Sequence, residues 1–271
     1  MFDMRYHIVS LVAVFLALAI GIMLGSSIEN RGVLKRQQER LVKSIEEDIA
    51  SIKSRNSELQ KQLETKAGFE EKVLPLLIED KLIEFNVAVI YFSDAPAPKL
   101  RADTIKTVKD AGANVQEIAL DRGALKRMTI PGQVIASGQD NKYASFIQFA
   151  SELVTTSGPV LAKLDEQGTW QAPAGFLPVN SVVMFAGGNK ESLEEVALAK
   201  ALKQARIKTV FVDSSDNKHS KVEAFVKEEI DTVDNLDMAY GRASLAYLLS
   251  GAGSGHYGVS SSAQELMPAL N

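Results

Sequence analysis

The stretch VAVIYF, residues 87–92, decides the fold that the sequence predicts for most of the chain. It is a short apolar run rich in β-branched and aromatic residues, which is typical of a strand buried on both faces. A helical stretch from 99 to 110 follows, Gly112 caps it, and residues 114–120 form the next expected strand. Strand, helix and strand in this order indicate a parallel pair joined by a crossover helix.

The same alternation returns in the C-terminal half of the chain. A further helix is expected at 143–155, and residues 165–180 resemble a loop. We expect strands at 181–185, 208–212 and 231–233, and helices at 191–204, 221–229 and 236–249. The sequence therefore predicts an α/β domain in three layers, with a mainly parallel sheet covered by helices on both faces.

The N-terminal segment predicts a membrane helix. Residues 8–28 carry no charge, and ~20 residues are needed to cross a bilayer as a helix. The alternative is a cleaved signal peptide, whose apolar core is about 7–15 residues long. The apolar run continues past the possible cleavage site at 17–19, and a helical pattern continues past the one at 25–27. We therefore expect a retained anchor. The flanking charges favour a cytoplasmic C-terminal side, but long domains cross regardless of charge, so the orientation stays open.

Small residues recur at every fourth position of this segment, at Ala13, Ala17, Gly21 and Gly25. Such a stripe lets two membrane helices pack closely. The alternative is that Ala and Gly are simply frequent in membrane helices. If the stripe packs, the anchor contributes to a dimer.

A long polar helix is expected from residue 29 to about 66, because this stretch has no Pro and no Gly after Gly32. Its apolar residues form a narrow stripe that needs a partner helix. If this helix follows a seven-residue repeat, its a and d positions hold Leu34, Leu41, Ile45, Ile52 and Leu59. We expect a homodimeric coiled coil, with a helix packed back on the domain as the alternative. Residues 69–84, interrupted by Pro75, resemble a kinked or second short helix.

These patterns predict four parts of the chain. We expect an N-terminus at 1–7, a transmembrane helix at 8–28, a coiled-coil stalk with a connecting helix at 29–84, and an α/β domain at 85–271.

Composition excludes several classes of function. The net charge of -4 gives no reason to expect nucleic acid binding. The chain has no cysteine, so disulfides, thiolate metal sites and cysteine nucleophiles are excluded. No GxSxG or HExxH pattern occurs, and we do not expect an enzyme. Gly187 and Gly188 follow a strand and suit an anion at a helix start, but the favoured explanation is a tight turn between strand and helix.

The C-terminal stretch has the most distinctive sequence of the chain. Asp234 or Asn235 is expected to cap a helix starting near Leu236, with Asp237 favourable at its positive end. The run from 251 to 258 predicts a helix C-cap and a tightly turned tail. The candidate motif residues are Asp234, Asn235, Asp237, Gly241, Gly255, His256, Tyr257 and Gly258.

These residues carry a family resemblance. TVDNLDMAYGRASLAYLL at 232–249 and GSGHYG at 253–258 resemble the end of the MctB family of mycobacterial-type copper transport proteins, which includes SteB-like envelope proteins. YHIVSLVAVFLALAIGIMLGS at 6–26 resembles its start, and DTIKTVKDAGANVQEIAL at 103–120 its first βαβ unit. The resemblance implies a cytoplasmic N-terminus, an anchor in the cell membrane, a stalk and an extracytoplasmic domain. It also implies copper transport or homeostasis, and for some relatives envelope assembly and division with a cytosolic partner.

The sequence itself offers few side chains that could act as copper ligands. Cu(I) prefers Cys and Met, and Cu(II) accepts His. The methionines form no MxxM or MxM cluster. His256 and Met238 are the weak candidate ligands near the family motif, and the favoured explanation is a structural loop and core methionines. The residues thus predict no cofactor, although the resemblance implies copper. A dimeric envelope scaffold or receptor with protein partners is the alternative function.

Overall fold

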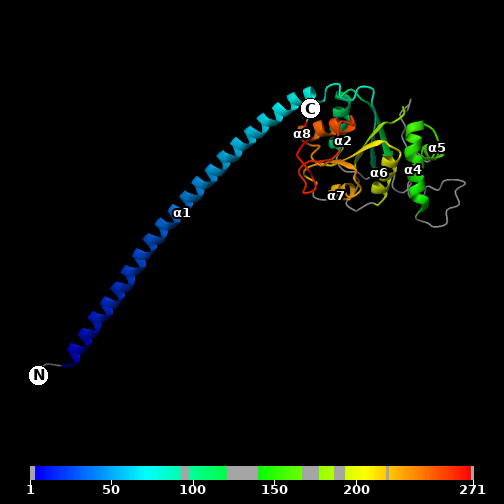
Figure 1. Cartoon of the computed structure of the whole chain (residues 1–271). Coiled ribbons are helices and arrows are strands. Elements are labelled where there is room, and N and C mark those ends of the chain that lie inside the picture. The colour runs from blue at the N-terminus through cyan, green and yellow to red at the C-terminus, as the bar shows by residue number, and fades with distance from the viewer. Residues whose placement is uncertain are drawn as a thin grey trace. The chain divides into compact units, whose positions relative to one another are not determined.

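The computed structural model describes residues 4–92, 98–120, 140–166, 177–185, 193–217 and 220–269. The chain divides into two compact units, Met1–Ala67 and Gly68–Asn271. The first unit is part of one long helix, and the second, the head, contains the sheet (Figure 1).

Helix α1 runs without a break from Met4 to Ile78. Its segment Met4–Gly25 is long and apolar enough to cross a membrane, with a mean hydropathy of 2.8. A separate second helix, one of the two alternatives for residues 69–84, is wrong, because helix α1 continues through Pro75 to Ile78. Proline removes one backbone donor from a helix. Leu74 and Ile78 bury their side chains in the head on either side of it, which offsets that loss.

The head contains a six-stranded, wholly parallel sheet in the order β2-β1-β3-β4-β5-β6. Its strands are β1 (Asn86–Phe92), β2 (Asn114–Leu120), β3 (Ser181–Phe185), β4 (Lys208–Val212), β5 (Asp231–Val233) and β6 (His256–Tyr257). The first five confirm the sequence prediction. The sixth corrects it, because part of the expected turned tail pairs with β5 as a strand.

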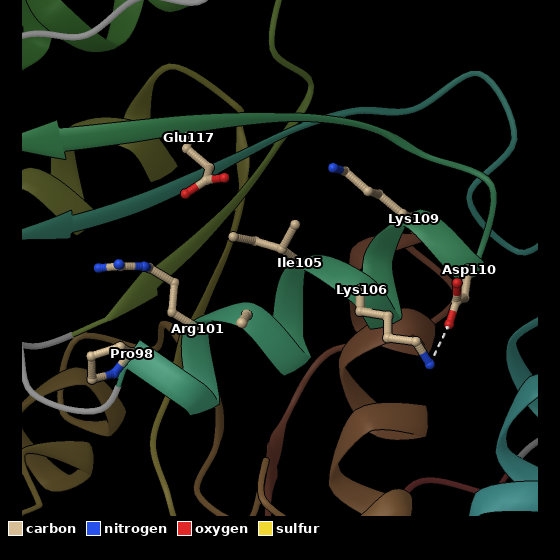
Figure 2. A pocket seen from close by; sticks show the side chains of 8 residues that line it. Pro98, Arg101, Ile105, Lys106, Lys109, Asp110 and Glu117 are labelled. Atoms are coloured by element: carbon tan, nitrogen blue, oxygen red, sulfur yellow. Dashed lines mark ion pairs between the residues drawn. The ribbon is translucent and has the colours of Figure 1, made fainter.

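The helices of the head follow the expected alternation, with changed ends. They are α2 (Pro98–Asp110), α4 (Asp140–Thr155), α5 (Pro159–Glu166), α6 (Leu193–Gln204), α7 (Val222–Val226) and α8 (Ala239–Leu249). Helix α2 lies beside the edge strand β2 (Figure 2). Helix α7 is shorter than expected, since the chain turns at Glu229 with a positive φ of 53°.

Helix α5 was not predicted. The buried carboxylate of Glu152 in α4 accepts hydrogen bonds from the backbone N–H groups of Val160 and Leu161, at 3.2 and 2.8 Å. This satisfies donors at the start of α5, which its own helix leaves open. The start of α5 is thus fixed by a residue of the preceding helix.

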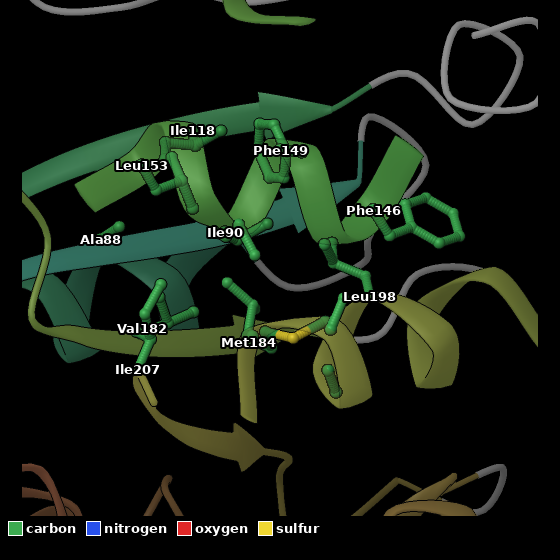
Figure 3. Close-up of a cluster of buried hydrophobic side chains, with 14 of the residues drawn as sticks. Ala88, Ile90, Ile118, Phe146, Phe149, Leu153, Val182, Met184, Leu198 and Ile207 are labelled. Atoms are coloured by element: carbon green, nitrogen blue, oxygen red, sulfur yellow. The ribbon is translucent and has the colours of Figure 1, made fainter. Parts of the chain in front are cut away.

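Alternate residues of β1 enter two different hydrophobic clusters. Ala88, Ile90 and Phe92 join a cluster with residues of α4, α6 and α7 (Figure 3). Val87 and Val89 join a second cluster with residues of α2, α8 and the end of α1. Successive residues of a strand point to opposite faces, so the two clusters lie on opposite sides of β1.

Candidate functional site

Three aspartates lie at the carboxyl edge of the sheet. Asp213 directly follows β4, and Asp234 and Asp237 follow β5. We call them the edge aspartates. Open parallel sheets bind ligands at this edge, so their surroundings decide whether the head has a site there.

Asp213 is buried, with 8% of its surface exposed. Its carboxylate accepts hydrogen bonds from the backbone N–H of Ser214 at 2.8 Å and from the Asn217 amide at 2.9 and 3.0 Å. Burial raises the pKa of Asp213 above its ordinary 3.8, although hydrogen bonds from Asn217, Ser220 and Ser214 act against the rise. The nearby charge of Asp234 adds to it.

Asp237 joins the turn before α8 to the loop after β4. It accepts hydrogen bonds from the backbone N–H of Ser215 at 2.7 Å and from the Ser215 hydroxyl at 2.6 Å. Burial raises the pKa of Asp237, but these hydrogen bonds together outweigh burial and hold the pKa below 3.8.

Asp234 fixes the segment that follows β6. Its two carboxylate oxygens accept hydrogen bonds from the backbone N–H groups of Val259 at 2.6 Å and Ser260 at 3.0 Å. A Cβ atom on Gly258 would overlap Asp234 Oδ1, and Gly258 has a φ of +145°. This turn therefore requires glycine.

The predicted helix cap is wrong. Helix α8 begins at Ala239, and its N-cap is Met238, whose side chain makes no capping hydrogen bond. Asp234 is engaged by the segment after β6, and the Asn235 amide donates to the carbonyl of Leu266 at 3.3 Å. Gly241 lets the helix approach Asn235, because a Cβ there would overlap its backbone carbonyl.

Both oxygens of every edge aspartate thus accept hydrogen bonds, from its own loop for Asp213 and from another loop for Asp234 and Asp237. This arrangement holds three loops together at the carboxyl edge. Within the parts of the chain that the structure describes, no group of three or more His, Asp or Glu side chains is placed to hold a metal ion. The edge aspartates therefore act as a structural brace.

The other motif residues form the last strand. Tyr257 pairs with Val233, and His256 Nδ1 lies 3.2 Å from the Thr232 hydroxyl. Burial lowers the pKa of His256, against the opposite effect of Asp231. Gly255, with a φ of +148°, donates its N–H to Asp231 at 2.7 Å. The GSGHYG motif thus contains β6, the strand at one edge of the sheet.

Two ion pairs were not anticipated from the sequence. Lys208 lies 2.6 Å from Asp231, and it also donates to the carbonyl of Gly253 at 2.7 Å. Lys221 and the fully buried Glu195 pair at 3.0 Å. Each pair joins residues more than 20 positions apart, so no local pattern could have identified it.

A groove lies between α2 and the edge strand β2 (Figure 2), with a volume of about 410 Å³. We call it the α2/β2 groove. The guanidinium of Arg101 sits 4.0 Å from the centre of the Tyr91 ring, and Lys106 pairs with Asp110 at 3.5 Å. The lining residues are Pro98, Arg101, Ala102, Ile105, Lys106, Lys109, Asp110 and Glu117. Among the described strands, none pairs with β2 on the side away from β1.

The remaining candidates lie on α1 or outside the described residues. The small-residue stripe falls within the membrane-length segment, and a Cβ on Gly21 or Gly25 would meet nothing within 4 Å. Seam residues of the expected coiled coil are exposed on the single chain: Leu41, Ile45, Ile52 and Leu59. Gly187, Gly188 and the side chain of Leu34 lie outside the described part.

The apolar N-terminal helix, the long helix and the parallel α/β head together define a membrane-associated α/β protein. A family model described as "Copper transport outer membrane protein, MctB" matches residues 1–129 and 154–268. The chain belongs to the MctB family. It is 26% identical, over an alignment of 306 residues, to the copper transporter MctB of Mycobacterium bovis, covering 95% of this chain and 96% of that protein. The copper transporter MctB of Mycobacterium tuberculosis matches to the same extent.

Proposed function

We propose that this protein is a single-pass, membrane-anchored protein of the cell envelope with a non-enzymatic role in copper transport or homeostasis. The match of the MctB family model to residues 1–129 and 154–268 carries this proposal. The apolar helix at Met4–Gly25 supports the anchor.

The proposed arrangement has four parts along the chain. Residues 1–7 lie in the cytoplasm, 8–28 cross the membrane, 29–84 form the stalk and connecting helix, and 85–271 form the extracytoplasmic domain. The two hydrophobic clusters on alternate residues of β1 support a three-layer head.

Any copper role of this chain is proposed to be indirect. His256 lies beside the Thr232 hydroxyl, and Met238 is the N-cap of α8 with 38% of its surface exposed. A single imidazole and a single thioether are too few ligands for a dedicated copper site. The head is therefore proposed to support copper handling by other envelope components.

Deleting the gene is expected to change the copper content and copper tolerance of the cells, and expression of the full chain should restore both. A chain carrying His256→Ala and Met238→Leu should restore them equally, because two isolated ligands do not make a site. Cell copper is measured by mass spectrometry.

Titration of the detergent-solubilised full chain with Cu(I) or Cu(II) is the accompanying control. Stoichiometric binding at micromolar protein that disappears in the double variant would contradict the indirect role. Unchanged copper content after deletion would contradict the copper role itself.

A dimer through the stalk is the second part of the proposal. The apolar side chains of the stalk are exposed on the single chain, and Ile45 and Ile52 are 48% and 59% exposed. A helix this long with a narrow apolar stripe is stabilised by a partner helix. The small-residue stripe at 13–25 is a further candidate contact within the membrane.

The alternative function is an envelope scaffold or receptor that acts through protein partners, from the envelope or the cytosol, in envelope assembly or division. The α2/β2 groove favours it. A free sheet edge can accept an extended segment as an added strand, and Arg101 and Lys109 line the helix side of this groove. With Lys106, Asp110 and Glu117, the lining has three cationic side chains and two carboxylates, and an extended acidic segment fits this small excess of positive charge.

Charge reversal in the groove is expected to release such a partner. Lys109→Glu should lose a protein that co-purifies with the cross-linked wild-type chain from native membranes, as measured by quantitative mass spectrometry. Lys227→Glu, an exposed reversal outside the groove, is the matched control. Equal recovery with all three chains would contradict binding through the groove.

A further inference from the structure

The stalk part of α1 carries one apolar row that no other described residue of the chain covers. The exposed fractions in this row range from 48% at Ile45 to 64% at Leu41. Its described members are Leu41, Ile45, Ile49, Ile52, Leu59 and Leu63. The row is therefore the place at which a second helix would bury the most apolar surface.

The row contains an eleven-residue repeat as well as the seven-residue repeat of Ile45, Ile52 and Leu59. Leu41, Ile52 and Leu63 are spaced by eleven. At about 100° per residue, positions eleven apart in an α-helix differ by only about 20°. Positions seven apart also differ by about 20° around the helix axis, but in the opposite direction and over seven residues instead of eleven.

The two repeats place different residues in the seam. Both repeats place Leu41 and Ile45 in the seam, and their seam positions differ after residue 45. The heptad places the charged residues Asp48 and Arg55 in the seam. The eleven-residue repeat replaces them with Ile49 and Asn56, it replaces Gln62 with Leu63, and it replaces Leu59 with Gln60, which lies eleven residues after Ile49. Only the second choice keeps charge out of the seam.

We propose that a second copy of this chain covers the row, in a parallel coiled coil with an eleven-residue repeat. This inference rests on the dimer proposed above and adds its register. An eleven-residue repeat gives a slightly right-handed supercoil, and a heptad gives a left-handed one. Asn56 then lies in the seam, where a polar residue specifies register.

Charge complementarity supports a second copy as the occupant. The eleven-residue seam is centred on the line through Ile45 and Asn56, and Asp48 and Lys53 lie on opposite sides of this line, about 70° from it. In a parallel pair, a flanking residue faces the one five positions later on the partner helix, as in e and g pairs. Asp48 thus faces the partner's Lys53, and the two-fold symmetry makes this pair twice. In the heptad register, Asp48 would instead face Asp48 of the second copy.

The head sets the end of the seam. Leu74 lies eleven residues after Leu63 on the same helix, and Ile78 follows one turn later. Both are buried in the core of the head, at 7% and 1% exposure. The row is covered by the chain's own sheet from Leu74 onward, so the seam with the second copy ends near Leu63.

Disulfide cross-linking of the full chain tests the register, and the chain has no native cysteine to interfere. Single cysteines are introduced as Asn56→Cys and Leu63→Cys, with Arg55→Cys and Gln62→Cys as matched neighbours. The chains are oxidised in native membranes, without a copper catalyst, and dimers are quantified on non-reducing gels. We expect at least a fivefold higher dimer yield at 56 and 63 than at 55 and 62.

Ile52→Cys separates failure of the register from failure of the dimer, because position 52 lies in the seam of both repeats. A dimer at 52 with higher yields at 55 and 62 than at 56 and 63 would overturn the eleven-residue register. No dimer at 52, 56 or 63 would overturn the dimer together with the register.

Discussion

Gly258→Ala is expected to destabilise the head by about 3 kcal/mol, from backbone strain and overpacking together. The added Cβ would overlap Asp234 Oδ1. That oxygen cannot easily move, because both oxygens of Asp234 are held by backbone N–H groups of the following turn. The residue also has a φ of +145°, which side chains disfavour. For a head of this size the melting temperature should fall by about 6–12 °C, as measured by calorimetry of the solubilised chain.

Gly251→Ala is the control for this variant. Gly251 also has a positive φ, +76°, but a Cβ there meets nothing within 4 Å. We expect a loss of about 1 kcal/mol from the left-handed backbone alone. Equal losses for the two variants would mean that the overlap with Asp234 is relieved at no cost, and that Asp234 does not brace this turn.

Ile52→Asp is expected to abolish the proposed dimer. The substitution places two carboxylates against each other in the seam, where a buried unpaired charge is strongly unfavourable. A loss of about 3 kcal/mol raises the dissociation constant more than a hundredfold. Analytical ultracentrifugation of the detergent-solubilised full chain measures the ratio of monomer to dimer.

Ala50→Asp introduces the same charge on the opposite side of α1, because two residues turn the helix by about 200°. It should leave the dimer intact. A dimer that survives both substitutions would require a contact elsewhere, and the small-residue stripe from Ala13 to Gly25 would be the first place to test.

The core of the fold could be predicted because its signals are local. Strands such as β3 (Ser181–Phe185) are short, mainly apolar runs, and their burial on both faces follows from that composition. The helices between them begin and end near turn residues such as Gly112, which has a φ of +98°. Each of these patterns lies within a dozen residues of sequence.

The candidate site could be predicted only in part, because its contacts are distant in sequence. Asp234 has the right type and position to cap α8, yet it binds backbone N–H groups 25 and 26 residues later. Capping α8 and binding the turn after β6 would require the same carboxylate. Reasoning from the local sequence considers only the cap. Strand β6 was missed for the same reason, since two residues pair with β5 only when the loop around them is held in place.

The position of β6 in the sheet has a consequence for how the head is made. This edge strand, at residues 256–257, and the turn that Asp234 holds are formed by the last described part of the chain. A nascent chain emerges from its N-terminal end, at about 5–20 residues per second. The proposed membrane helix is thus synthesised before the head, and β6 is synthesised after the other five described strands. Until that strand arrives, the side of β5 that pairs with it stays open and prone to mispairing. The head is therefore most vulnerable to proteases and aggregation in the interval between the synthesis of β5 and that of β6.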